Sequence, residues 1–420
     1  MQHCLAGFFP PPAISAVIIF ALTYLILIGQ KLPFVQLDRP SGATIGAVLM
    51  IALGVMTPTE AYRDAVDHAT LVLLLGMMII AGYLAEAGFF RWASHRVIRS
   101  AGTPRRLLIG LTIVCAMLSA LVVNDTVCLM VTPLVVRLID DAELPPLPFL
   151  LAVAFGANAG SAATPTGNPQ NMIIVTLSGI PYTDFVASLL PAAMAATAVV
   201  LGLLLLLFRK ELDGARLSQV RLDPPPLDRP LLVKGLVALL GVVVGFLAGF
   251  DLAFTALAGG AFLMLVARRA PRRVLLRVDW LLLLFFAALF VVVHGVGTTG
   301  LLERAFARVA PFATGSPLRE ASVLATSSVV GSNLFSNVPF VMLAARFIPS
   351  FTDPTLAWKV LALSSTLAGN LTLVGSVANL IVFEAAGAKG HVSFSRFLRY
   401  GLPITALSCA TGVAVLLLLR

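Results

Sequence analysis

A short polar motif occurs twice in this chain, and each copy interrupts a long apolar segment. Residues 167–173 have the sequence GNPQNMI, and residues 375–381 have the sequence GSVANLI. Glycine, proline and side-chain amides are costly in an apolar helix, because lipid offers no hydrogen bonds to an opened backbone. The motif therefore predicts two membrane helices that break at matching places in the two halves of the chain.

The composition is that of a chain embedded in a membrane. Hydrophobic residues make up 59% of the sequence and charged residues only 12%, against about 25% charged residues in soluble domains. Apolar runs of the ~20 residues that span a bilayer recur along the chain. We expect an all-α polytopic membrane protein with about ten spans plus two re-entrant helical hairpins. Too little sequence remains between the spans for a soluble catalytic or nucleotide-binding domain.

The apolar segments form two series with the same order. Continuous spans are expected at residues 13–30, 41–56, 69–88, 185–208, 231–249, 252–267, 279–300 and 396–419. Helix–break–helix hairpins are expected at residues 105–139 and 319–349, and broken spans at residues 147–178 and 356–386.

The two series indicate an internal duplication. Residues 1–208 are expected to form the first repeat and residues 231–420 the second, joined by a charged cytoplasmic linker at residues 209–230. Equivalent positions lie about 212 residues apart; the pairs are Asp67 and Asp279, Gly88 and Gly300, Arg96 and Arg308, Asn124 and Asn337, and Asn171 and Asn379. A nearly constant offset over this distance favours duplication.

The basic residues predict an orientation in the membrane. If each hairpin leaves by the side it entered, 22 of the 29 Lys and Arg residues fall on one face. The positive-inside rule places that face in the cytoplasm, and both chain termini on the outer face of the inner (plasma) membrane. The hairpins then enter from opposite sides, so the repeats have inverted topology. The same rule accounts for the net charge of +9 without a nucleic-acid partner.

The hairpin tips and the breaks bring four helix starts toward one region. Residues 123–126 (VNDT) form the first tip and residues 336–339 (SNVP) the second. A helix N-terminus presents unpaired N–H groups and a partial positive charge, which suits an anion. Unwound carbonyl groups beside the breaks suit a cation. The predicted substrate- and ion-binding residues are Asn124, Asp125, Thr126, Thr164, Thr166, Gly167, Asn168, Asn171, Ser336, Asn337, Thr372, Gly375, Ser376 and Asn379.

Asp125 is the acidic residue expected near the middle of the membrane. A carboxylate there is expensive, so Asp125 is a candidate carrier of a proton or a candidate partner of Na⁺. Asn124 and Gly167 would complete the Na⁺ position. The alternative role of Asp125 is to cap the second arm of the hairpin. The alternative role of the tip and break asparagines is capping and contact between helices.

Nothing in the sequence indicates an enzyme or a resident cofactor. P-loop, HExxH and G-x-S-x-G patterns are absent, and no structural metal site is expected. H⁺ or Na⁺ is expected as the coupling ion, a small anion as the substrate and the lipid bilayer as the surrounding partner. His294 is interpreted as a packing residue, with a proton relay as the alternative, and Glu86 and Glu384 as residues near the membrane interface.

Together the motifs resemble the ion-transporter superfamily, which includes citrate transporter-like permeases, arsenite permeases, NhaD-type sodium/proton antiporters and divalent-anion/sodium symporters. The resemblance rests on Asn124–Thr126, Thr132–Pro133, Gly156–Asn171, Ser336–Pro339 and Asn370–Asn379. It implies an inverted-repeat fold with a scaffold domain and a moving transport domain, often as a homodimer. The dicarboxylate symporters carry Ser-Asn-Thr at both tips, whereas the first tip here is closer to arsenite permeases, which favours proton coupling. The first break, GNPQN, is closer to citrate transporter-like permeases.

The expected function is secondary active transport of a small organic or inorganic anion, coupled to H⁺ or Na⁺ and working by alternating access. One alternative is a Na⁺/H⁺ antiporter in which Asp125 binds both ions in competition. Another is an arsenite efflux permease, including the membrane subunit of an ATP-driven pump. The first tip and break carry more polar groups than the second, so we expect them to hold the coupling ion.

Overall fold

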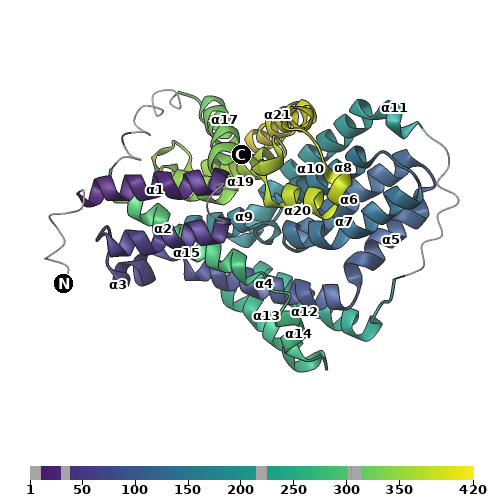
Figure 1. The fold of residues 1–420 in the computed structure, drawn as a ribbon, viewed down its shortest axis with the longest axis horizontal. Coiled ribbons are helices and arrows are strands. Elements are labelled where there is room, and N and C mark those ends of the chain that lie inside the picture. The colour runs from purple at the N-terminus through teal and green to yellow at the C-terminus, as the bar shows by residue number, and fades with distance from the viewer. Residues whose placement is uncertain (1–10, 30–37, 214–224, 301–303, 305–314) are drawn as a thin grey trace.

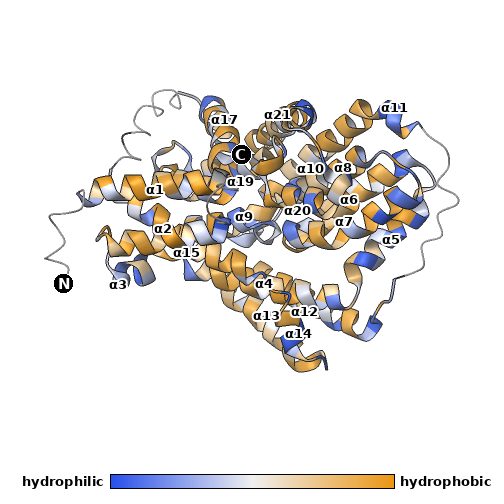
Figure 2. Cartoon of the chain, viewed as in Figure 1, coloured by the Kyte–Doolittle hydropathy of each residue, from blue (hydrophilic) through white to orange (hydrophobic). Residues whose placement is uncertain are grey.

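The computed structural model describes residues 11–29, 38–213, 225–300, 304 and 315–420. These residues form helices joined by short turns, and no strand occurs among them (Figure 1). Apolar residues dominate most of the helices, as Figure 2 shows in orange. Some are strongly exposed, such as Phe254 at 72% and Leu265 at 84%. Apolar side chains this exposed suit a lipid surface better than water.

The helices of the first half are α1 (Pro12–Gly29), α2 (Arg39–Ala52), α3 (Pro58–Glu60), the π-helical turn η2 (Ala61–Ala65), α4 (His68–Glu86), α5 (Phe89–Ala101), α6 (Pro104–Leu121), α7 (Asn124–Asp141), α8 (Pro146–Ser161), the 3₁₀ turn η3 (Pro165–Gly167), α9 (Pro169–Ser178), α10 (Tyr182–Leu207) and α11 (Arg209–Leu212).

The helices of the second half are α12 (Arg229–Leu247), α13 (Leu252–Val266), α14 (Pro271–Leu275), α15 (Trp280–Gly297), α17 (Pro317–Phe335), α18 (Asn337–Ala345), the 3₁₀ turn η4 (Ile348–Ser350), α19 (Pro354–Ala368), the 3₁₀ turn η5 (Leu373–Gly375), α20 (Val377–Ala385), the 3₁₀ turn η6 (Gly387–Gly390) and α21 (Phe394–Leu418). Much of the predicted linker, and Arg308, lie outside the described residues.

Six of the described helices are long and apolar enough to cross a membrane, namely α4, α6, α10, α12, α15 and α21. Shorter apolar helices are α8, α13 and the Pro12–Leu27 part of α1. The predicted all-α membrane fold is therefore confirmed. Fewer helices reach full length than the ten expected spans, partly because each broken segment is made of two short helices.

The helices break at the two polar motifs. The first broken segment is interrupted between Ser161 and Pro169, and the second between Ala368 and Val377. The two hairpins turn at Val122–Val123 and at Ser336. A 3₁₀ turn lies inside each break, so the backbone is partly unwound there.

Equivalent positions in the two halves have the same local structure. The Asp67 side chain accepts a hydrogen bond from the Thr70 N–H at 3.2 Å and caps α4. The Asp279 side chain caps α15 in the same way, through the Leu282 N–H at 2.9 Å. Gly88 and Gly300, which follow these helices, have φ angles of 86° and 67°, a left-handed conformation that favours glycine.

The two halves interlock through exchanged helices. α2 of the first half packs against α15 of the second, and α13 of the second packs against α4 of the first (Figure 1). A Cβ on Gly76 of α4 would lie 2.5 Å from the carbonyl carbon of Ala256 on α13, so glycine permits this approach. The remaining long helices pack α6 on α8, α17 on α19 and α10 on α21 around the two breaks.

Residues 89–101 form a helix, α5, that the sequence analysis did not predict. α5 buries Phe90 and Ile98 on one side and exposes Arg91, Arg96 and Arg99 on the other. An amphipathic helix of this kind can lie along the membrane interface. The helical spacing of its apolar residues was hard to recognise among the many basic residues, which were used only to predict the orientation in the membrane.

Substitution of Gly160 by alanine should destabilise the packing of α6 on α8. A Cβ at this position would lie 2.1 Å from the Ala116 carbonyl oxygen, and overpacking of this kind costs about 1–3 kcal/mol. We expect a lower melting temperature for the purified G160A protein. The matched control is Gly202→Ala on α10, where no atom lies within 4 Å of the new Cβ. Equal melting temperatures for both variants would contradict the close contact.

Candidate functional site

A small cavity lies where the four helix starts meet. Its volume is about 40 Å³, enough for a few water molecules or one small ion. It is lined by Asn124, Asp125, Pro169, Gln170, Leu282, Phe285, Phe286, Ser336, Asn337, Val338, Ser376 and Val377. Both tips, both breaks and α15 therefore contribute to its wall.

Four helices begin at this cavity. α7 begins at Asn124, α9 at Pro169, α18 at Asn337 and α20 at Val377. Each of them is at least nine residues long. Their N-termini therefore direct partial positive charge toward one space, an arrangement that attracts an anion.

Asp125 brings a carboxylate to the same space. It lies in the first turn of α7, is half-buried and lines the cavity. It forms none of the ion pairs found among the described residues. The N-cap position of α7 is Val123, and no side chain caps this helix end. The alternative role of Asp125 as a helix cap is therefore not supported.

The second tip is strained. Ser336 has a φ of 71° and a ψ of 157°, a backbone conformation costing about 1–3 kcal/mol in residues other than glycine. The next residue, Asn337, packs against the second break. With its amide oriented to suit its neighbours, its nitrogen donates to the Ser365 carbonyl at 3.3 Å and to the Gly375 carbonyl at 3.0 Å.

Two buried asparagines donate hydrogen bonds to the backbone of the two breaks in the same way. The Asn171 Nδ2 donates to the carbonyl oxygens of Ser161 at 3.2 Å and Thr164 at 3.0 Å. The Asn379 Nδ2 donates to the carbonyl oxygens of Gly369 at 2.7 Å and Thr372 at 3.0 Å. In both cases the acceptors lie ten and seven residues before the asparagine. These amides supply hydrogen bonds that the unwound backbone lacks.

The remaining predicted residues of the first break lie behind the cavity wall. Asn168 caps α9 by accepting from the Asn171 N–H at 2.9 Å, and its Nδ2 donates to the Thr366 hydroxyl at 3.2 Å. The Thr164 hydroxyl donates to the Ala120 carbonyl at 2.7 Å, which ties the break to α6. A Cβ on Gly167 would lie 2.2 Å from the Ser161 carbonyl oxygen.

The second break is tied to its hairpin by a side chain instead. The Thr372 hydroxyl donates to the Asn333 Oδ1 at 2.8 Å, and the Asn333 Nδ2 donates to the Ala368 carbonyl at 2.9 Å. A Cβ on Gly375 would lie 2.6 Å from the same Asn333 oxygen. Of the other predicted residues, Ser376 reaches the cavity wall, whereas Thr126 and Thr166 are absent from it.

The sequence analysis missed a pair of asparagines at the centre of the site. Asn158 on α8 and Asn370 after α19 lie 212 residues apart, and their side chains are hydrogen-bonded at 2.9 Å. Positions related by a two-fold repeat can touch only near the axis that relates them. The constant offset of 212 residues therefore identifies the two asparagines as equivalent positions, but it does not show that they are in contact.

A partly buried cation was also missed. Arg39 opens α2 and lines a second cavity of about 40 Å³ together with Asn333 and Ser336. Arg39 precedes the span predicted at residues 41–56, and the sequence analysis did not include it among the site residues. The exposed fraction of a residue at a helix start depends on its three-dimensional neighbours, which the sequence pattern did not reveal.

Other predicted polar residues lie away from the central cavity. His294 is half-buried on α15, with Arg346 as a charged neighbour. Glu86 pairs with Arg277 at 2.5 Å, and Glu384 is exposed. None of these three lines the cavity.

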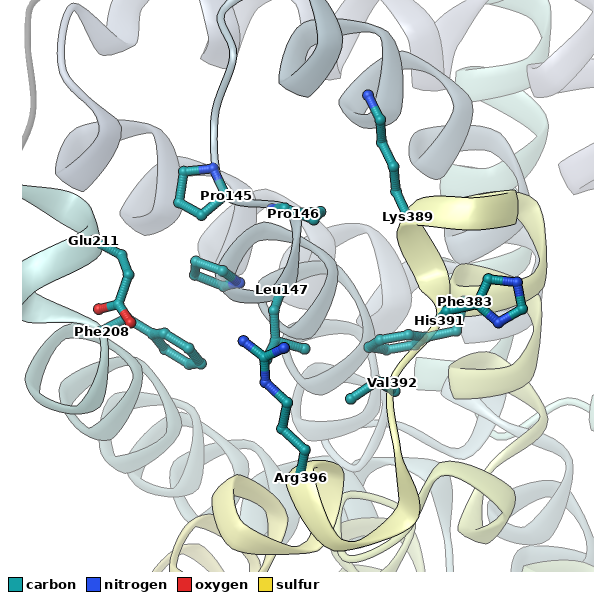
Figure 3. A pocket seen from close by; sticks show the side chains of 11 residues that line it. Pro145, Pro146, Leu147, Phe208, Glu211, Phe383, Lys389, His391, Val392 and Arg396 are labelled. Atoms are coloured by element: carbon teal, nitrogen blue, oxygen red, sulfur yellow. The ribbon is translucent and has the colours of Figure 1, made fainter.

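Two further cavities contain none of the predicted site residues. One, of about 440 Å³, lies between α4, the α9–α10 turn and the α12–α13 turn. The other, of about 110 Å³, is lined by Glu211 and Arg396, which point into it, and by Lys389 and His391 (Figure 3). Lys389 also pairs with Asp140.

Comparison with known proteins supports a transporter architecture. The sequence profile of the citrate transporters matches residues 22–368. The chain is 31% identical to the silicon efflux transporter LSI3 of Oryza sativa, over 97% of this chain and 98% of the relative. It is 26% identical to a transporter named arsB from Dictyostelium discoideum, over 96% and 92% of the two chains. The YdaH transporter of Alcanivorax borkumensis shares the fold, with a TM-score of 0.57, 15% identity and coverage of 97% and 98%.

Substitution of Asn379 by alanine should destabilise the second break. It removes the donor to the buried Gly369 carbonyl, and an unpaired buried carbonyl costs about 1–3 kcal/mol. We expect a lower melting temperature than that of Thr197→Ala, which removes only a hydroxyl bonded within its own helix. If both variants melt at the wild-type temperature, Asn379 does not hold the break together.

Proposed function

Because the chain belongs to the citrate transporter family, we propose that it is a secondary active transporter of a small anion, driven by H⁺ or Na⁺. The observation that carries this proposal is the convergence of four helix N-termini and one carboxylate on a single cavity. The N-termini suit an anion. Asp125 offers a group that takes up a proton or pairs with Na⁺. Alternating exposure of the cavity to the two sides of the membrane would link these movements.

The size of the cavity supports a small solute. A space of about 40 Å³ is far below the ~300 Å³ at which pockets begin to enclose larger organic ligands, so citrate would require the site to open. The names of the rice and Dictyostelium relatives refer to silicon and to arsB. We therefore favour a small inorganic oxyanion, or the neutral oxyacid from which it forms, as the substrate class.

A Na⁺/H⁺ antiporter is the second candidate, because Asp125 is a cavity carboxylate without an ion-pair partner among the described residues. Competition of Na⁺ and H⁺ for this carboxylate would exchange the two ions. In energised everted vesicles, added Na⁺ would then raise the luminal pH without any anion present. A luminal pH that responds only when the anion is added would favour anion transport.

The orientation and assembly are part of the same proposal. We place the chain in the inner membrane as two inverted repeats, with both termini outside, on the distribution of basic residues. Exposed apolar side chains such as Phe254 on α13 would contact lipid or a second copy in a homodimer.

Impermeant thiol labelling in a cysteine-free background tests this orientation. A cysteine replacing Leu419 should react in intact cells, whereas one replacing Ser218 in the linker should react only after the cells are opened. The reverse pattern would contradict the proposed topology.

Flux into proteoliposomes tests the transport proposal. With arsenite, silicic acid and citrate as separate probes, a pH or Na⁺ gradient should drive at least one probe above its equilibrium level. Asp125→Asn should reduce that gradient-driven component by about tenfold or more, because the neutral amide cannot exchange a proton. The matched control is Asp184→Asn, an exposed residue on α10. Transport that ignores both gradients would refute coupling, and transport that requires an added ATPase would indicate a pump subunit.

A further inference from the structure

One side chain joins the two halves of the site. Asn158 is buried in α8, with 1% of its surface exposed. Its Nδ2 donates to the Asn370 Oδ1 at 2.9 Å and to the Asn379 Oδ1 at 3.1 Å. Its Oδ1 accepts from the Asn124 Nδ2 and from the Ser376 hydroxyl, both at 3.1 Å. An amide has two donor hydrogens and two acceptor lone pairs, so all four are used.

These four bonds connect the first tip to the second break. Asn124 is the first residue of α7 and precedes Asp125 in the same helical turn. Ser376 is the N-cap of α20 and lines the cavity. A single amide therefore joins the first tip to the opposite wall of the cavity.

The equivalent residue of the second half is incompletely bonded. The Asn370 Nδ2 is buried without a hydrogen-bond partner, and so is the Asn171 Oδ1. Asn171 is the counterpart of Asn379, and Asn370 is the counterpart of Asn158. The Asn158–Asn379 bond therefore has a counterpart, from Asn370 to Asn171, that is not formed in this conformation.

Unpaired buried amide atoms are rare and costly. The Asn370 Nδ2 and the Asn171 Oδ1 occupy the positions equivalent to the Asn158 Nδ2 and the Asn379 Oδ1, which are hydrogen-bonded to each other. A second arrangement of the network in which the two unpaired atoms bond to each other would satisfy both. The network is thus asymmetric in the conformation described here, although its residues occur in equivalent pairs.

We propose that Asn158 and Asn370 are positioning residues that couple the two halves of the site. Asn158 transmits the state of the first tip, at Asn124 and Asp125, to the second break at Ser376 and Asn379. The unformed Asn370–Asn171 bond closes in the other conformation of the transport cycle. The inference rests on the proposed function, because it assumes that the coupling ion acts at Asp125.

A double-mutant cycle tests this coupling without knowledge of the substrate. The parent protein lacks the cysteines at 4, 115, 128 and 409 and carries Val377→Cys on the second side of the cavity. Asp125→Asn imitates the protonated carboxylate. The readout is the rate at which N-ethylmaleimide labels the cysteine at position 377. We expect Asp125→Asn to change this rate by more than about twofold in the parent, and to have no effect after Asn158→Ala, because coupled residues give a non-additive response.

The matched control is Asn333→Ala. Asn333 supports the second break through Thr372 and Ala368, all within one half of the chain, so the response to Asp125→Asn should persist in this variant. Asn158→Ser, whose short hydroxyl cannot reach all four partners, replaces Asn158→Ala if that protein does not purify as a single species. The same loss of response is expected.

A response that persists in the Asn158 variants would overturn the coupling role. Loss of the response in Asn333→Ala as well would also overturn it, because general loosening would then explain both results. A parent protein that does not respond to Asp125→Asn would instead remove Asp125 as the coupling residue on which the inference rests, whereas the proposed function itself is tested by flux.

Discussion

The side chains of Asn171 and Asn379 supply the hydrogen bonds that allow two helices to break inside apolar segments. Lipid cannot satisfy the polar groups of a broken helix, so a break inside an apolar segment needs internal donors. Each of these amides donates two hydrogen bonds, one to a carbonyl group at the end of the preceding helix and one to a carbonyl group inside the break. Because these carbonyl groups have hydrogen-bond partners, α9 and α20 can begin at the centre of the protein, and their N-termini can face a cavity.

The two halves use the same framework but carry different chemistry. The first tip places Asp125 at the cavity, and the helix that follows the first break, α9, is capped by the Asn168 side chain. The second tip has no acidic residue, holds Ser336 in a strained conformation and lies beside Arg39. Asp125 therefore suits a cation on the first side, whereas Arg39 lies in the wall of a neighbouring cavity that shares Ser336 with the central one. Under the proposed function, the coupling ion would bind in the first half, at Asp125.

Much of this architecture could be predicted from the sequence, because membrane helices are set by local properties. Apolar runs and the repeated GNPQN and GSVAN motifs predict where helices begin and break to within a few residues, although α2 and α18 each end four residues earlier than expected. The contact between Asn158 and Asn370 could not be predicted, since the offset of 212 residues indicates equivalence without distance. Arg39 and α5 were missed for a related reason. Their charges resemble those of any basic loop until the packing against neighbouring helices is known.

We propose that the cavity between the tips and breaks binds the transported solute. A ligand that binds the folded protein raises its melting temperature. At a concentration one hundred times its dissociation constant, the ligand adds about 2.7 kcal/mol to the free energy of unfolding. The most direct measurement compares this shift between the wild type and two variants, Val338→Trp and Val377→Trp, which fill the cavity from its second side. The ligands are arsenite, silicic acid, carboxylates and Na⁺. The account predicts that a solute that stabilises the wild type stabilises neither variant. The same shift in all three proteins would place the binding site elsewhere.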